Sequence, residues 1–244
     1  MTNIVDNSIY ALYRNHDELR DAAKTLRTNL EFSGIDHEIR SVAVTSAEMS
    51  VGKSTIGICL GFAMAETGKR VLLIDNDFRN PQVAMRLKVR STYTLSDLLA
   101  GKVPAVNACV PTREENLYVL DLGNRRLNNP VEVMSSAKYK AMIQQLGEYF
   151  DFVIIDTPPI GMFIDAALAS QMVDGVLFVI NSGKTTSREV KEALSQLEKA
   201  NARVLGAVVN NVHRTNSNYY YYDRQGNKKR KKSSKRFSFL TGNR

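Results

Sequence analysis

The chain has 244 residues, enough to bury one α/β core, and a single domain is the expected organisation. Its formal net charge is +8, but nine of its 33 basic residues lie between Arg224 and Arg244, a stretch without acidic residues. The rest of the chain is close to neutral, which argues against a nucleic-acid-binding domain; the basic tail instead fits an anionic membrane surface or another polyanion.

No apolar run approaches the roughly 18 to 20 residues that a membrane helix needs, and the N-terminus lacks the residue order of a secretory signal. We therefore expect a cytoplasmic protein. Cys59 and Cys109 are far apart and lack metal-ligand spacing, so we expect core thiols in a reducing compartment.

The first recognisable element is a helix that precedes the first strand, whereas residues 1–14 give no clear signal. We expect Asn15 to cap this helix and Glu18 to reach back to the cap. Apolar residues then recur at helical spacing, namely Leu19, Ala23, Leu26 and Leu30. On another flank, charged residues recur three apart, namely Asp21, Lys24 and Arg27, for which a solvated charged face is one of two interpretations.

The next stretch has the pattern of a phosphate-binding loop. The apolar run Val42–Val44 leads into Ser46–Thr55, which is followed by an apolar, helix-favouring segment that ends near Thr67. A strand that turns directly into a helix leaves backbone N–H groups available to hold phosphates. We expect the phosphates to lie against Glu48, Met49, Ser50, Val51, Gly52, Lys53, Ser54 and Thr55. An ordinary strand-to-helix turn is the alternative, because Ala47 replaces the usual glycine.

Within that loop three residue types suit the chemistry. Gly52 lets the backbone approach the phosphates, Lys53 supplies a positive charge for the β and γ groups, and Ser54 offers a hydroxyl to Mg²⁺. Together they predict an ATP and Mg²⁺ site.

Two later segments are continuous apolar runs, which is typical of buried parallel strands, and each ends in an acidic residue. Asp75 and Asp77 follow the first run, and Asp156 follows the second. Open α/β sheets bind ligands at the carboxyl ends of their strands, so we expect these acids to hold Mg²⁺ near the phosphates. Each could alternatively be a simple turn residue.

The remaining pattern alternates strands and helices. We expect helices at Leu95–Gly101, from Asn128 to about Tyr149, from Asp165 and at Ser187–Ala200, and strands at Leu117–Leu120, Gly175–Ile180 and Val204–Asn210. We expect Val103–Asn116 to be a loop, and Asp165 to begin the next helix, where it can act as the cap. The whole predicts a P-loop NTPase fold with a doubly wound, mostly parallel sheet flanked by helices.

The end of the chain changes character. Four consecutive tyrosines are flanked by polar residues and then by Lys228–Lys232, without a periodicity that would bury four rings on one side. These are Tyr219, Tyr220, Tyr221 and Tyr222. We expect a flexible tail over 215–244, after an N-terminal segment at 1–14 and a P-loop domain at 15–214. A strand of stacked tyrosines at an interface is the alternative.

Several motifs together resemble the bacterial tyrosine kinases, the cytoplasmic kinase subunits of capsule and exopolysaccharide synthesis. Leu72–Pro81 is similar to the extra Walker A′ motif of that family, and Asp156–Pro159 with Asp165 further on is similar to its Walker B region. Asn129–Glu132 and Thr25–Leu30 are similar to other family motifs, and the likeness spans roughly residues 18 to 222.

The resemblance implies an ATP-dependent tyrosine autokinase that phosphorylates the tyrosine cluster of a neighbouring subunit, that is Tyr219, Tyr220, Tyr221 and Tyr222. It implies Mg²⁺ held by Ser54, Asp75 and Asp156, with Lys53, Asp75, Asp77 and Asp156 as catalytic residues. Asp77 would orient or deprotonate the tyrosine, and Arg79 would lie beside the nucleotide. In related P-loop ATPases, the residue at the position that corresponds to Asn210 or Asn211 forms a hydrogen bond with adenine.

The resemblance also implies partners. We expect a homo-oligomeric ring, an octamer, whose subunit contacts lie on the helix at 15–33 and include Asp21, Lys24 and Arg27, although two of these three depart conservatively from the family pattern. We further expect a membrane-embedded activator, a cognate tyrosine phosphatase and a location at the inner face of the plasma membrane.

Two alternatives remain open. Switch ATPases of the ParA or MinD kind share the fold but carry a signature lysine five residues before the P-loop lysine, and this chain has Glu48 there. A scaffold with a degenerate nucleotide site is the other, because Met49 and Ser50 replace the kinase family's Pro-Gly. Ser50 would be strained if the backbone there requires a positive φ.

Overall fold

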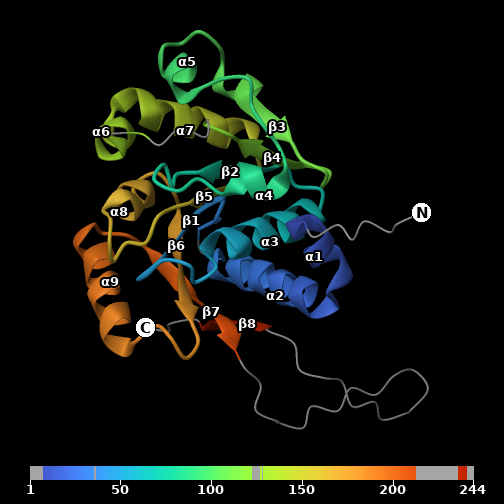
Figure 1. Ribbon diagram of the computed structural model, residues 1–244, viewed down its shortest axis with the longest axis vertical. Coiled ribbons are helices and arrows are strands. Elements are labelled where there is room, and N and C mark those ends of the chain that lie inside the picture. Colours follow the sequence, from blue (N-terminus) through green and yellow to red (C-terminus); the bar gives the residue numbers. More distant parts are fainter. Residues whose placement is uncertain (1–7, 36, 123–126, 128, 213–235, 241–244) are drawn as a thin grey trace.

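A computed structural model describes residues 8–35, 37–122, 127, 129–212 and 236–240. Its centre is an eight-stranded sheet in the order β3-β4-β2-β5-β1-β6-β7-β8 (Figure 1). The strands are β1 (Ser41–Ser46), β2 (Val71–Asp75), β3 (Cys109–Pro111), β4 (Leu117–Leu120), β5 (Phe152–Asp156), β6 (Gly175–Asn181), β7 (Val204–Val212) and β8 (Arg236–Leu240). The six inner strands are parallel, and β3 and β8 pair antiparallel at the two edges. The predicted doubly wound, mostly parallel sheet is confirmed.

Helices cover both faces of the sheet (Figure 1). They are α1 (Ile9–Asn15), α2 (Asp17–Ser33), α3 (Lys53–Ala65), α4 (Val83–Leu87), α5 (Leu95–Leu99), η1 (Ala105–Ala108, a 3₁₀ turn), α6 (Pro130–Ser135), α7 (Ala137–Tyr149), α8 (Asp165–Ser170) and α9 (Ser187–Lys199). One core lies between the sheet and α1 to α4, and the second lies between the sheet and α5 to α9.

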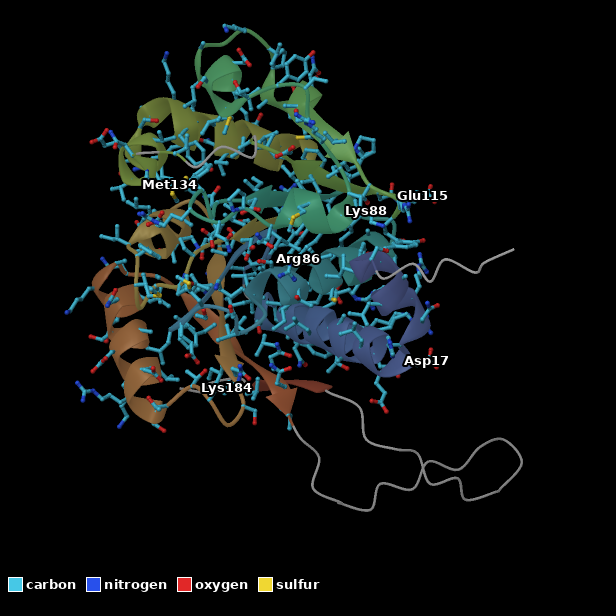
Figure 2. The ribbon with its side chains drawn as sticks, in the orientation of Figure 1. Asp17, Arg86, Lys88, Glu115, Met134 and Lys184 are labelled. Atoms are coloured by element: carbon cyan, nitrogen blue, oxygen red, sulfur yellow. The ribbon has the colours of Figure 1, made fainter. Side chains whose placement is uncertain are left out.

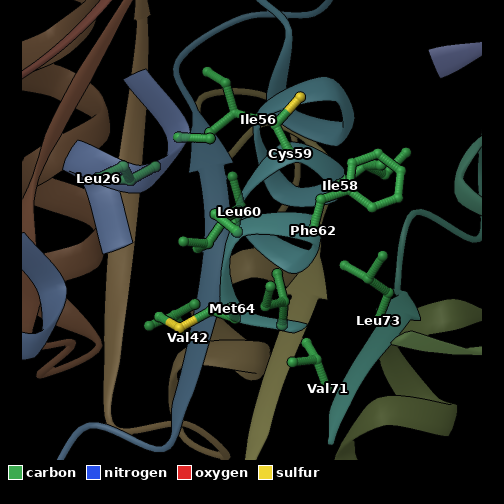
Figure 3. Close-up of a cluster of buried hydrophobic side chains, with 14 of the residues drawn as sticks. Leu26, Val42, Ile56, Ile58, Cys59, Leu60, Phe62, Met64, Val71 and Leu73 are labelled. Carbon is green, nitrogen blue, oxygen red and sulfur yellow. The ribbon is translucent and has the colours of Figure 1, made fainter. Parts of the chain in front are cut away.

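Helix α3 lies at the middle of the first core (Figure 3). Its sequence is apolar all round and nearly all of its side chains are buried, which is typical of a helix enclosed by other elements. Phe62 and Leu60 are fully buried, and each contributes about 1.5 to 3 kcal/mol by leaving water. The chain is thereby fixed on both sides of the loop that joins β1 to α3.

The start of α2 differs from the prediction. Its cap is His16, which makes no side-chain capping bond, and Asn15 is instead the last residue of α1. Helix α1 was not predicted from the sequence. It is held by tertiary packing, because the Tyr13 ring is fully buried and lies 4.9 Å from the Phe62 ring. The core face of α2 is as predicted, with Ala23, Leu26 and Leu30 buried and Leu19 packed against them.

Three further differences have local causes. The helix expected up to Tyr149 is two helices, because Ser136 leaves helical geometry and its hydroxyl accepts the backbone N–H of Tyr139 to cap α7. The expected loop at Val103–Asn116 contains η1 and the short edge strand β3. Helix α8 begins at Asp165 but is capped by Ile164 without a side-chain bond, so Asp165 does not cap it.

Among the described residues, no helix has the length and apolarity that a membrane crossing requires. Cys59 is a buried free thiol and Cys109 is a partly buried one, as expected. The strand β8 falls within the tail expected at 215–244 and was not predicted from the sequence, and residues 213–235 lie outside the described residues.

Candidate nucleotide site

The loop between β1 and α3 has the geometry of a phosphate cradle. Gly52 has a φ of 101° and Ser50 a φ of 59°, so two residues in the loop are left-handed. Gly52 accepts this conformation freely, whereas Ser50 adopts it at a cost of about 1 to 2 kcal/mol. The strain anticipated at Ser50 is therefore present, and the strand, turn and helix predicted here are confirmed.

Lys53 opens α3 and is buried. Burial lowers its pKa, because the charged ammonium loses water, while the nearby carboxylates of Asp156 and Asp77 oppose that shift. A buried lysine facing two acids, at the N-terminal end of a helix, is a cation held ready for a polyanion.

Asp75 and Asp156 end the neighbouring strands β2 and β5 and are directly opposite in the parallel register. Both are buried. Loss of water and their mutual repulsion raise the pKa of Asp75 to about 8. Burial raises the pKa of Asp156 to about 6, although a hydrogen bond from Ser54 and the charge of Lys53 lower it.

The two acids have different partners. Asp75 accepts backbone N–H bonds from Asp77 at 3.1 Å, from Gln82 at 2.7 Å and from Val83 at 2.9 Å, so it orders the turn after β2 and the start of α4. In contrast, the buried Oδ1 of Asp156 has no hydrogen-bond partner among the described residues. An unpartnered buried carboxylate oxygen beside a serine hydroxyl suits a hard cation.

Asp77 lies at the same rim and is partly exposed. Its Oδ1 accepts the backbone N–H of Asn80 at 3.0 Å. Burial raises its pKa, whereas the Asn80 bond and the charge of Lys53 lower it. A partly exposed carboxylate with a raised pKa can accept a proton from a bound hydroxyl group.

Arg86 is a site residue that was not predicted from the sequence. Its side chain is labelled in Figure 2 and extends from α4. Its guanidinium donates to the Thr55 hydroxyl at 2.8 Å. Its charge also lowers the pKa of Asp156. The residue gave no signal in the sequence because α4 is only five residues long and was not predicted.

Asn210 closes the other side of the loop. Its Nδ2 donates to the Val51 carbonyl at 2.7 Å, and a Cβ atom at Gly52 would overlap this amide. Asn211 has a φ of 57° and its Nδ2 donates to Asn181 Oδ1 at 3.1 Å. In this structure both predicted adenine-side residues are therefore engaged with protein groups.

Glu48 and Met49 lie at the start of the loop. The Glu48 carboxylate accepts the Thr185 hydroxyl at 2.7 Å, from the segment between β6 and α9. Met49 is 54% exposed, so it is not core material.

Arg79 pairs with Asp165 rather than with an acid of its own loop. Its Nη2 lies 3.3 Å from Oδ2 of the fully buried Asp165, and its guanidinium carbon lies 4.1 Å from the centre of the Phe163 ring. The pair joins the loop after β2 to the first residue of α8. The Nε of Arg79 and the Oδ1 of Asp165 have no hydrogen-bond partner within the described residues.

The residues predicted for subunit contacts lie elsewhere, on α2. Lys24 pairs with Glu66 at 3.3 Å, and Arg27 donates to the Ala63 carbonyl at 2.8 Å, so both contact α3 and the turn after it within the chain. Asp21 takes part through its backbone carbonyl, which accepts the Thr25 hydroxyl at 2.8 Å.

The predicted acceptor tyrosines are not among the residues that the structure describes. All four lie outside the described residues, namely Tyr219, Tyr220, Tyr221 and Tyr222. Their role as acceptors and the alternative of a stacked interface strand both stay predictions.

The described side chains fit a magnesium-bound triphosphate. The left-handed Gly52 leaves the backbone bare, Lys53 is a buried cation, and the Asp156 oxygen without a partner lies beside the Ser54 hydroxyl. Together they provide N–H groups, a positive charge and oxygen ligands at one rim of the sheet.

Comparisons with known proteins agree with this geometry. A model of the ParA family, described as the NUBPL iron-transfer P-loop NTPase, matches residues 38–241. The tyrosine-protein kinase YwqD of Bacillus subtilis is 37% identical over 187 residues, which cover 77% of this chain and 78% of that protein. CpsD, a tyrosine-protein kinase of Streptococcus pneumoniae serotype 4, is 36% identical over 186 residues, with 76% and 81% covered. The solved kinase domain of the Escherichia coli tyrosine kinase ETK has a TM-score of 0.78 and 28% identity, covering 88% of this chain and 84% of that domain.

The fold and the site thus define a P-loop NTPase, and the chain belongs to the ParA family that the matching model describes. Within that group, the relatives of 36 to 37% identity are tyrosine-protein kinases. The chain belongs to the bacterial tyrosine kinase family.

Proposed function

We propose that this chain is an ATP-dependent protein-tyrosine kinase that phosphorylates its own cluster Tyr219–Tyr222 in trans and regulates capsular or exopolysaccharide synthesis and export. The role in polysaccharide synthesis rests on the family resemblance. The chemistry is supported by one observation: the buried Asp156, which ends β5 beside Asp75 at the end of β2, has a carboxylate oxygen without a hydrogen-bond partner among the described residues.

Phosphoryl transfer to tyrosine asks the protein mainly for alignment and charge neutralisation. In our proposal the loop amides and Lys53 would hold the triphosphate, and Ser54, Asp75 and Asp156 would hold Mg²⁺ directly or through water. Bound Mg²⁺ would neutralise charge on the phosphates. The tyrosine oxygen attacks the γ-phosphorus, its proton passes to Asp77, and the bond to ADP breaks. An ordinary tyrosine pKa near 10 makes such a base useful.

Arg79 and Arg86 complete the charge balance of the rim. Arg86 donates to Thr55, next to Ser54, and Arg79 follows Asp77 by two residues in the loop after β2. Both would face the negative charge that a triphosphate brings.

We further propose assembly with other proteins. A ring of copies, an octamer, would use Asp21, Lys24 and Arg27 of α2, and the two basic residues would then exchange their contacts with α3 and Glu66 for contacts with a neighbour. A membrane-embedded activator would bring the kinase to the inner face of the plasma membrane. The basic tail would add contact with anionic lipid, and a cognate phosphatase would reverse the modification.

A switch ATPase of the ParA or MinD kind is the second candidate, favoured by the match to the ParA family model. Glu48 weighs against it. The side chain in the place of the signature lysine is an acid bonded to Thr185. A scaffold with a weakened nucleotide site is the third candidate, favoured by the strained Ser50.

The test is phosphotyrosine formation by the purified chain with MgATP, with and without the cytoplasmic segment of its activator. We expect Lys53→Met and Asp77→Asn to abolish the signal while circular dichroism is unchanged. Asp17→Asn, at an exposed acid remote from the rim, is the control. To test transfer in trans, Lys53→Met is mixed with an active chain whose four clustered tyrosines are phenylalanine. ATP hydrolysis without phosphotyrosine would favour the switch ATPase, and absence of both would favour the scaffold.

A further inference from the structure

The C-terminal strand β8 returns to the sheet after the tyrosine cluster. It pairs antiparallel with β7 at the edge of the sheet, beside α2 (Figure 1). Without β8 the edge of β7 would present a row of unpaired backbone groups, which proteins commonly cover. The strand therefore occupies a surface that is built to take an extended segment.

The pairing of β8 with β7 is interrupted at one position. Val209 lies opposite Ser238 and Val212 lies opposite Arg236, so three steps along β7 correspond to two along β8. This is a β-bulge with one extra residue on β7, and Asn211 within it is left-handed at a φ of 57°. Bulges next to active sites commonly redirect a side chain.

The side chain presented at this bulge is the amide of Asn210. Its Nδ2 donates to the Val51 carbonyl of the P-loop, and its Oδ1 accepts the Asn211 N–H at 2.8 Å. On the other side, the Ser182 N–H donates to the Asn210 carbonyl at 2.9 Å. The bulge is thus held by the chain after β6 on one side and by β8 on the other, and it contacts the loop that would cradle the phosphates.

We propose that the edge of β7 is the docking surface for the chain's own β8, and that docking strengthens nucleotide binding by fixing the Asn210 bulge against the P-loop. The proposal rests on the proposed function only in taking ATP as the nucleotide. An undocked β8 would free the β7 edge to relax, and the amide contact with Val51 would be made for a smaller fraction of the time.

The occupant is β8 of the same chain because residues 213–235 connect the two strands directly. Both neighbours of that segment, Val212 and Arg236, are paired with each other in the sheet. A covalent connection of this length gives β8 an effective concentration that a separate peptide would have to exceed. The strand is also close in sequence to the proposed acceptor tyrosines, so modification and docking concern the same part of the chain.

The first experiment compares two shortened chains, one ending at Lys235 and one ending at Leu240. Only the second keeps β8. We expect MgATP to bind the chain ending at Lys235 about three- to tenfold more weakly, the effect of losing about one hydrogen bond, with equal circular dichroism for both. With Asn210→Ala in both chains, the difference should disappear, because the bulge no longer has an amide to present. Equal affinities in the two chains without this substitution would overturn the coupling.

A point substitution in the full chain avoids truncation. Ser238→Pro removes a backbone N–H from β8, whereas Ser238→Ala at the same position retains it. We expect only the proline variant to weaken MgATP binding. The same MgATP affinity in both variants would refute the coupling.

Hydrogen exchange tests docking without nucleotide, which separates this inference from the proposed function. Backbone amides of Ala207–Val212 should exchange faster in the chain ending at Lys235 than in the chain ending at Leu240, and equal exchange would refute the docking. By linkage, MgATP should slow exchange in β8 of the full chain. Faster exchange in β7 on dilution would instead assign the strand to a second copy and overturn the intramolecular docking. If the full chain binds no MgATP, the proposed function fails and the coupling with it.

Discussion

Replacing Asp156 with asparagine should stabilise the nucleotide-free protein while it removes a proposed Mg²⁺ ligand. The pKa of this buried carboxyl is raised from 3.8 to about 6, with burial as the main cause, despite the hydrogen bond from Ser54 and the charge of Lys53. The folded state therefore disfavours the carboxylate on balance. A rise of this size corresponds to on the order of 3 kcal/mol of unfolding free energy at pH values where the group is ionised in both states. The neutral amide of Asp156→Asn escapes this cost.

The pH dependence has a definite sign. Above about pH 6 the wild-type carboxylate is ionised in both states, so the full advantage of Asp156→Asn should be present. As the pH falls from about 6 toward 4, the folded wild type takes up the proton first and recovers stability, and below about pH 4 the two proteins should be equal. Urea unfolding in the presence of EDTA, at about pH 4, 6 and 8, measures this difference.

The control is Asp97→Asn, at a surface acid whose pKa is lowered to about 2 by Lys102 and Thr94. Here the folded state favours the carboxylate, so the substitution should destabilise the protein above about pH 4, with the opposite sign. If Asp156→Asn were no more stable than wild type at about pH 8, the buried Asp156 carboxylate would not destabilise the nucleotide-free protein, and the reasoning would be wrong.

Two further predictions concern neighbouring contacts. Gly52→Ala should abolish or greatly weaken MgATP binding, because the φ of Gly52 is 101° and a Cβ atom there would overlap Asn210. The control is Gly68→Ala, at a φ of 85° with open space around it, which should cost about 1 kcal/mol of stability and leave MgATP binding unchanged. Equal MgATP affinities for the two variants would contradict this. Arg79→Ala should cost about 3 kcal/mol in urea unfolding, because it leaves the fully buried Asp165 carboxylate without its partner, and the added substitution Asp165→Ala should recover part of that loss; a strictly additive double variant would mean that the pair is not coupled.

Much of the nucleotide site could be predicted from local sequence. Each part of the prediction used a rule that concerns only a few adjacent residues. These parts are the apolar strand before Ser46, the glycine and lysine of the loop, and the carboxylates that follow two apolar strands. Parallel strands must present their carboxyl ends at one edge, so the convergence of Lys53, Asp77 and Asp156 followed from the order of elements.

Other contacts join distant segments and left no local signal. Arg86 reaches Thr55 from a helix of five residues, and Arg79 pairs with Asp165 across the sheet rim. Tyr13 holds a helix whose own sequence gives no helix signal in isolation. The interruption between α6 and α7 at Ser136 could have been predicted from the sequence, because a serine directly before a helix is a capping signal.

By itself, the sequence determined the class of fold, the position of the loop between β1 and α3 and which strands end in an acidic residue, because periodicity and turn chemistry are local properties of the chain. Only the tertiary structure decided that Asn210 closes the P-loop, that Asp75 is bound by three backbone N–H groups and that β8 covers the edge of β7. These contacts join residues that are far apart in the chain. Their geometry depends on how the strands pair in the sheet and where a bulge forms, and no short stretch of sequence encodes either feature.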